Sequence, residues 1–128
     1  MIFGIGTDIM DVGRVRKSLI KDPDLRYEIF TPKEIDYCES KVNKYQHYAA
    51  RFAAKEAFMK ALGIGWQFGI RFTHIETIND EKGKPIMILH AKGKDFSTEK
   101  GITKILVSLA HLKDFATAMV VLEWKTDG

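Results

Sequence analysis

The chain has 128 residues, 45% of them hydrophobic and 29% charged, which is typical of one folded domain. Its 20 Lys and Arg against 17 Asp and Glu give a net charge of +3, which suits an acidic partner without requiring a nucleic acid. The longest stretch without Asp, Glu, Lys or Arg, residues 61–70, is about half the length that a membrane-spanning helix needs. We therefore expect a single domain over residues 1–128 that neither crosses a membrane nor binds nucleic acid.

Two features of the sequence bear on the compartment. Residues 1–8 lack the basic start of a secretory signal, and Asp8 interrupts their apolar run. Cys38 is the one cysteine in the sequence, which excludes an intrachain disulfide and suits a reducing compartment. These features predict a cytoplasmic protein.

The first predicted element is a strand over residues 2–10. Gly4, Gly6 and Asp8 alternate with larger side chains, so they share one face of the strand, and the two glycines leave space beside the Asp8 carboxylate. A carboxylate in such apolar surroundings needs a cation, hydrogen-bond donors or water. Backbone N–H groups at the strand end would meet this need as well as a functional partner would.

A helix over residues 12–21 follows. It has an apolar stripe and a separate basic face formed by Arg14, Lys17 and Lys21. Taken alone, this face is better explained as an ordinary solvated helix surface than as a binding surface.

Two further helices are predicted before the middle of the chain. Thr31 is the N-cap of a short helix that ends near residue 40, with a capping-box sequence after it. Residues 43–62 are rich in Ala, Lys, Glu and Met, and Gly63 occupies the C-cap position. The loop over residues 64–69 has enough glycine to lie close to another backbone or a ligand.

The remaining residues predict two hairpins around a short helix over residues 92–99. The hairpins join residues 72–78 to 85–91 and residues 104–109 to 115–122. The last strand is nearly apolar on both faces and needs cover on both sides, one of which a second copy of the chain could provide. We therefore expect an α+β fold in which an antiparallel sheet packs on the long central helix.

The central helix carries a second candidate for chemistry. Phe52, Glu56 and Lys60 stack on successive turns, while Ala53 and Ala57 allow another element to approach closely. A Glu and a Lys four residues apart also form ordinary surface ion pairs worth about 0.3–0.5 kcal/mol. The spacing alone leaves both interpretations open.

A third candidate lies in residues 108–111. Ser108 and His111 are three positions apart, so on a strand, where successive side chains alternate, they point to opposite faces. The sequence also has no Gly-x-Ser-x-Gly turn that would support a nucleophile–base pair. We expect His111 to contact backbone or a phosphate. No Cys or His falls at zinc-ligand spacing.

Together these segments resemble the holo-acyl-carrier-protein synthase family, the small 4'-phosphopantetheinyl transferases, over nearly the whole chain. The resemblance rests on residues 4–9 (GIGTDI), residues 51–57 (RFAAKEA) with Lys60, residues 83–85 (GKP), and residues 108–111 followed by Ala116 and Ala118. Each segment is weak alone, but their order and spacing in a chain of this length are specific. The resemblance implies the phosphopantetheinyl transferase fold and a homotrimer with sites at subunit boundaries.

The activity that the resemblance implies is transfer of the 4'-phosphopantetheine group of coenzyme A to a serine of apo acyl carrier protein, in fatty acid biosynthesis. Adenosine 3',5'-bisphosphate is released, and magnesium is required. Asp8 and Glu56 match the two metal-binding carboxylates, and Lys60 matches a lysine near the pyrophosphate, so these three are the implied catalytic residues. The assignment suits magnesium, which is usually held by one or two carboxylates plus substrate phosphates and water.

Binding residues are implied in the same way. Arg14 matches an arginine that meets the acidic recognition helix of the carrier protein, and Lys17 and Lys21 share its helix face. The residues expected to contact coenzyme A are Arg51, Lys60, Gly63, Gly65, Pro85, Ser108 and His111.

A non-catalytic module that binds coenzyme A or an acidic helix is the alternative function. Asp8 and Glu56 argue against it, because a pocket that only binds anionic phosphates has no use for two acids.

Overall fold

The computed structural model describes residues 1–125, which form two antiparallel sheets and five α-helices. The elements in chain order are β1 (Ile2–Asp11), α1 (Val12–Lys21), α2 (Leu25–Ile29), α3 (Pro32–Glu39), α4 (Lys44–Leu62), the 3-10 turns η1 (Trp66–Phe68) and η2 (Phe72–His74), β2 (Ile75–Asn79), β3 (Pro85–Leu89), α5 (Ala91–Glu99), β4 (Ile102–His111) and β5 (Phe115–Trp124). The α+β class and the antiparallel sheet packed on a long central helix are confirmed. In the described part of the chain, no helix is both long and apolar enough to cross a membrane.

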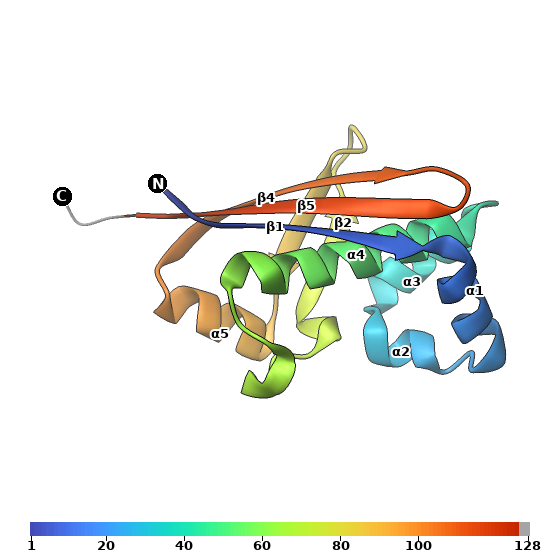
Figure 1. Ribbon diagram of the computed structural model, residues 1–128, viewed down its shortest axis with the longest axis horizontal. Helices are drawn as coiled ribbons and strands as arrows, with labels where there is room; N and C mark the ends of the chain where they lie inside the picture. The colour runs from blue at the N-terminus through green and yellow to red at the C-terminus, as the bar shows by residue number, and fades with distance from the viewer. Residues whose placement is uncertain (126–128) are drawn as a thin grey trace.

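The larger sheet has the strand order β1-β5-β4, and β2 and β3 form a separate hairpin. Figure 1 shows α4 running along one side of the larger sheet, with α1, α2 and α3 near one end of it and α5 near the other. The side chains of β5 follow this arrangement, because alternate residues from Ala116 to Leu122 are buried while Phe115 and Met119 on the other face are about half exposed.

The core forms around α4. Its buried residues include many alanines, which favour the helix and keep its backbone close to its neighbours. One apolar cluster joins its N-terminal half to α1, α2 and α3 and includes the fully buried Cys38, and a second joins its C-terminal half to β5, β2 and β3. Gly63 ends the helix as expected, with a left-handed φ of 80° and hydrogen bonds from its N–H to the carbonyls of Met59 and Lys60.

Direct backbone contact fixes β1 against α4. A Cβ atom at Gly4 would lie 1.9 Å from the carbonyl oxygen of Ala61, and one at Gly6 would lie 1.9 Å from the carbonyl oxygen of Ala57. The two glycines are therefore needed for the strand to lie on the backbone of the helix. Asp8 is the next residue on the same face of β1, so this contact also decides where its carboxylate meets α4.

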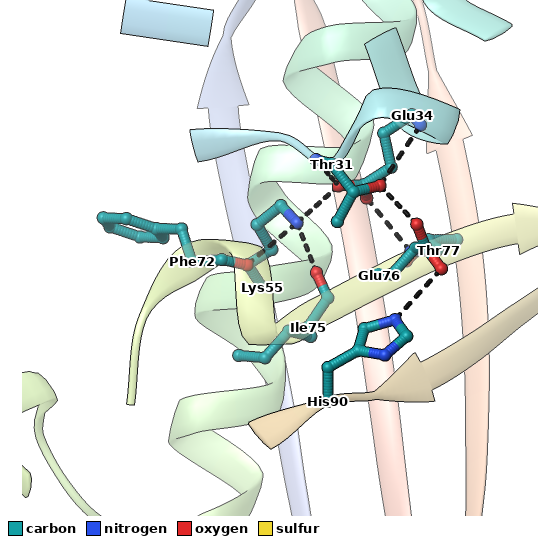
Figure 2. Close-up of polar contacts among 8 residues, drawn as sticks. All are labelled: Thr31, Glu34, Lys55, Phe72, Ile75, Glu76, Thr77 and His90. Atoms are coloured by element: carbon teal, nitrogen blue, oxygen red, sulfur yellow. Dashed lines mark hydrogen bonds and ion pairs between the residues drawn. The ribbon is translucent and has the colours of Figure 1, made fainter. Parts of the chain in front are cut away.

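A buried polar cluster fastens α4 to α3 and to the start of β2 (Figure 2). Lys55 and Glu34, both with fully buried side chains, form an ion pair of 2.7 Å, and the Lys55 ammonium also donates to the carbonyls of Phe72 and Ile75. Glu34 accepts two backbone hydrogen bonds as well, from Thr31 in the expected capping box and from Thr77 in β2. The charges are thus compensated on both sides, which a buried pair requires.

The cluster continues through the side chains of Thr31 and Glu76 to His90, the residue directly after β3. The Thr31 hydroxyl donates to Glu76, and the other carboxylate oxygen of Glu76 lies 3.1 Å from Nε2 of His90. Burial pushes the pKa of Glu76 upward, but the hydrogen bonds to Thr31 and His90 outweigh it and the pKa is lowered.

The structure corrects one prediction and adds one element that was not predicted. The sequence predicts a strand from residue 72, but residues 72–74 form η2 and β2 begins at Ile75. The physical reason is that the carbonyls of Phe72 and Ile75 both accept hydrogen bonds from the Lys55 ammonium, so the backbone of residues 72–75 curves around it. The sequence also missed α2, a five-residue helix whose N-cap residue, Asp24, makes no side-chain capping bond.

We predict that Gly6→Ala lowers the free energy of unfolding by about 3 kcal/mol or more, because the added methyl group meets backbone that cannot rotate away. Urea denaturation followed by circular dichroism measures this change. Gly65→Ala is the matched control: its methyl group would meet the far end of the exposed Gln67 side chain, which can move. Equal stability of the two variants would contradict the proposed β1–α4 contact.

Candidate active site

The structure brings Asp8 of β1 next to Lys60 of α4. The Lys60 ammonium donates to Oδ1 of Asp8 at 2.9 Å and to the carbonyl oxygen of Thr7 at 3.1 Å. The Asp8 side chain is 15% exposed and that of Lys60 is 56% exposed, so the acid lies at the base of the pair and the lysine faces solvent. The hydrogen bond from Lys60 to Asp8 and the charge of that carboxylate, with a smaller contribution from Glu56, raise the pKa of Lys60. Lys60 is therefore a cation and a donor at neutral pH.

Glu56 lies one helical turn before Lys60, and its carboxylate adds to the negative potential around the lysine. Its Oε2 accepts a hydrogen bond of 3.2 Å from the indole Nε1 of Trp66. The three predicted catalytic residues therefore lie together; we call Asp8, Glu56 and Lys60 the Asp8 site.

The donor set of the Asp8 site fits a hard divalent cation. Oδ2 of Asp8 is buried and has no hydrogen-bond partner among residues 1–125, although a buried carboxylate oxygen normally has one. Within the same residues, no group of three or more His, Cys, Asp and Glu side chains could hold a metal ion. Two carboxylates are nevertheless sufficient for magnesium, which completes its shell with substrate phosphates and water, whereas a structural zinc site needs more protein ligands.

A separate pocket of about 210 Å³ lies at the other end of α4. Six of its lining residues are Tyr37, His47, Arg51, Asn79, Pro85 and His111; we call it the Arg51 pocket. It contains three of the residues expected to contact coenzyme A. Asp8, Glu56 and Lys60 are not among the residues that line it.

Arg51 is held rigidly in this pocket. Its guanidinium donates to Oδ1 of Asn79 at 2.8 Å and lies 4.0 Å from the centre of the Tyr37 ring, while Nε has no partner within residues 1–125. His47 contributes a second polar group whose ring centre is 5.1 Å from that of His111. Burial is the main cause that lowers the pKa of His47 to about 4, and the nearby His111 and Arg51 lower it further. The His47 imidazole is therefore neutral at physiological pH.

The other expected contacts of coenzyme A lie elsewhere. Gly63 follows the last residue of α4, and Gly65 precedes η1. Both belong to the loop that brings Trp66 to Glu56, so they lie closer to the Asp8 site than to the Arg51 pocket along the chain. Ser108 pairs with Met119 and, like it, is exposed on the face of the larger sheet away from α4. The structure therefore places Ser108 away from the Arg51 pocket.

The basic face of α1 is exposed, as expected for Arg14, Lys17 and Lys21. Asp11, the last residue of β1, caps α1 by accepting a hydrogen bond from the Arg14 backbone, so the helix begins without an intervening loop. Arg14 also lines an apolar cavity of about 300 Å³ together with Phe30 and Phe52. Phe52 is one turn before Glu56 on α4, which places this cavity beside the Asp8 site.

Sequence analysis missed several residues that shape these sites. No sequence motif distinguishes Lys55 from the other lysines of α4, although its position four residues after Arg51 places both on one face of the helix. Trp66 and His47 carried no motif, because the partners that define them, Glu56 and His111, come from other elements.

Comparison with known proteins identifies the family. Residues 4–120 match the model of the 4'-phosphopantetheinyl transferase superfamily. The holo-[acyl-carrier-protein] synthase of Geotalea daltonii is 45% identical over 124 residues, which cover 96% of this chain and 99% of that protein.

Solved structures agree with this match. The crystal structure of holo-[acyl-carrier-protein] synthase from Neisseria meningitidis has a TM-score of 0.88 and 34% identity, with 96% of this chain and 99% of that chain covered. The corresponding synthase from Bacillus anthracis, solved in complex with coenzyme A (3',5'-ADP), has a TM-score of 0.78 and 36% identity, with 98% and 99% covered. The chain belongs to the 4'-phosphopantetheinyl transferase superfamily and, within it, to the holo-[acyl-carrier-protein] synthases.

Proposed function

We propose that this chain, as a single domain of residues 1–128, transfers the 4'-phosphopantetheine group of coenzyme A to a serine of apo acyl carrier protein. In this reaction the serine oxygen bonds to the phosphorus next to pantetheine, and the serine proton is lost. The bond from that phosphorus to the bridging oxygen breaks, and adenosine 3',5'-bisphosphate leaves. The observation that carries the proposal is the Asp8 site, in which a carboxylate with one buried, unpartnered oxygen lies beside an exposed lysine.

Asp8 and Glu56 would hold magnesium in this site. When bound, the ion would supply positive charge that offsets the charge of the pyrophosphate and of the leaving oxygen. Asp8 has an oxygen to offer besides the one that binds Lys60, and Glu56 approaches from α4. The substrate phosphates and water would complete the shell.

Lys60 would bind the pyrophosphate directly. Its ammonium is held at its base by Asp8 and Thr7, yet more than half of the side chain is exposed, so it can donate to an anion in solvent. A fixed cation aimed at developing negative charge stabilises a transition state without reorganising first. Its raised pKa excludes it as the general base.

The Arg51 pocket supports the coenzyme A assignment. A buried guanidinium with an unpartnered Nε, next to an exposed histidine, suits a phosphate group, and Pro85 provides an apolar wall for a base. We propose that the pocket binds the phosphate-bearing nucleotide end of coenzyme A, and that Gly63 and Gly65 contact the part of coenzyme A that reaches the Asp8 site.

We also propose that the sites are completed between copies in a homotrimer. The face of the larger sheet away from α4 carries Ile5, Ile9, Phe115 and Met119, each roughly half exposed or more. Strand register places these side chains on adjacent positions of β1 and β5, which makes the patch continuous. Ser108 lies on the same face, so its expected contact with coenzyme A would cross between copies.

The acidic carrier protein is the proposed partner of α1. Opposed charges at such a surface mainly raise the association rate and fix orientation. The apolar cavity that Arg14 lines with Phe30 and Phe52 adds a depression next to these charges, beside the Asp8 site. We place the reaction in the cytoplasm, consistent with the buried, unpaired thiol of Cys38.

The first prediction concerns the metal-binding acids. Asp8→Asn and Glu56→Gln should each lower the rate of transfer at least about 100-fold, because several kcal/mol of charge stabilisation are lost. Mass spectrometry of apo acyl carrier protein incubated with coenzyme A and Mg²⁺ measures the transfer. Asp95→Asn, at an exposed position of α5, is the control and should keep full activity. Absence of any mass increase with the unmutated chain would overturn the proposed function itself.

The second prediction concerns carrier docking. Arg14→Glu should raise the KM for acyl carrier protein about tenfold or more and leave the KM for coenzyme A nearly unchanged, because it reverses a charge at the docking surface. Lys94→Glu on α5 makes the same charge change at another exposed helix and should alter neither value. Equal changes in both KM values for Arg14→Glu would contradict a docking role.

The third prediction concerns assembly. Light scattering should give a trimer mass for the unmutated chain, and Met119→Asp should shift it toward the monomer and reduce transfer, since it places charge in the apolar patch. Val42→Asp, at a fully exposed loop position, should leave the trimer intact. A monomer mass for the unmutated chain would rule out the composite site.

A further inference from the structure

Trp66 joins the glycine-rich loop to the Asp8 site through a single hydrogen bond. Its indole Nε1–H donates to Oε2 of Glu56 at 3.2 Å. The indole is partly buried, and its ring centre lies 4.2 Å from that of Phe72. The tryptophan therefore contacts a proposed metal ligand on one side and an aromatic support on the other.

The support of Trp66 leads back to the buried ion pair. The carbonyl of Phe72 accepts a hydrogen bond of 3.1 Å from the Lys55 ammonium, which Glu34 holds at 2.7 Å. Lys55 and Glu56 are consecutive residues of α4, so the contacts form a closed ring from Lys55 through Phe72 and Trp66 to Glu56. Such a ring fixes the indole relative to the helix that carries the carboxylate.

The loop around Trp66 has the conformation that this contact needs. Gly65 is extended before η1, and Gly69 follows it with a left-handed φ of 83°. Two glycines therefore bracket the three-residue turn that presents the indole to Glu56. The same indole lines an open cavity of about 520 Å³ with Tyr27, Arg71 and Phe72.

We propose that Trp66 is a positioning residue for the transfer reaction: its N–H orients the Glu56 carboxylate, which would hold the cation together with Asp8. The inference rests on the proposed function. A ligand carboxylate is usually oriented by a hydrogen bond from a neighbouring group, and removal of that group typically weakens metal affinity or activity 10–100-fold. Trp66 acts through Glu56 and does not itself bind the metal.

Metal affinity tests the proposal. Mn²⁺ is titrated into the full chain, and electron paramagnetic resonance counts the free ion. Trp66→Phe, which keeps an aromatic ring against Phe72 but removes the N–H, should raise the Kd about tenfold or more. Trp124→Phe is the matched control, because it removes the other indole of the chain, whose Nε1 has no partner in the described residues. Its Kd should equal that of the unmutated chain.

Activity gives an independent readout. Trp66→Phe should raise the Mg²⁺ concentration needed for half-maximal transfer and leave the KM for acyl carrier protein unchanged. A merely structural loss would lower the amount of active protein without this separation. If Trp66→Phe and Trp124→Phe need the same Mg²⁺ concentration for half-maximal transfer, the positioning role is overturned.

A spectroscopic measurement on the unmutated residue covers the case in which Trp66→Phe fails to fold. The two indole ¹H–¹⁵N resonances are assigned with Trp124→Phe, and the Trp66 resonance should move both in Glu56→Gln and on addition of Mg²⁺. A Trp66 resonance that stays in place in Glu56→Gln would overturn the hydrogen bond.

Glu56→Gln separates this inference from the proposed function. If Glu56→Gln binds Mn²⁺ as tightly as the unmutated chain, the assignment of the metal site fails. If Glu56→Gln loses Mn²⁺ while Trp66→Phe retains full affinity, the metal site stands and the positioning role of Trp66 is refuted.

Discussion

The geometry of the Asp8 site depends on the direct contact of two backbones, β1 and α4. At Gly4 and Gly6 no side chain separates the strand from the helix, so the next residue on that face, Asp8, can only lie beside the C-terminal turns of α4. Lys60 therefore meets Asp8 although 52 positions separate them in the chain. A wider spacing would leave the acid and the lysine unable to form a hydrogen bond, and the charges of the Asp8 site would be dispersed.

Two lysines of α4 form ion pairs of nearly equal length with opposite consequences. Lys55 and Glu34 are 2.7 Å apart with no exposure, and separation would leave a bare charge in the core, at a cost of about 3–5 kcal/mol. Lys60 and Asp8 are 2.9 Å apart, but the lysine is largely in solvent, where a pair is worth about 1 kcal/mol or less. The first pair therefore stabilises the fold, whereas the second costs little to separate, which leaves the Lys60 ammonium free to pair with another anion.

The sequence predicted those parts of the fold that depend on local pattern. The helix over residues 12–21, the capping box at Thr31 and the left-handed end at Gly63 follow from periodicity and cap chemistry, and the structure has all three. The contents of the site were predicted by resemblance, and the structure does bring Asp8, Glu56 and Lys60 together. The 3-10 turn at Phe72, the burial of Lys55 and the contact of Trp66 with Glu56 were out of reach, because each depends on a partner from a distant segment.

The fully buried position of Cys38 makes this protein convenient for labelling. Burial, partly opposed by the charge of Arg51, raises the pKa of the thiol to about 12, so hardly any reactive thiolate exists at neutral pH. A cysteine introduced at an exposed position would then be the one thiol that maleimide reagents modify in the folded chain. A fluorophore or spin label could be attached at a chosen point of α5 without first replacing the natural cysteine, and the core around α3 would stay intact.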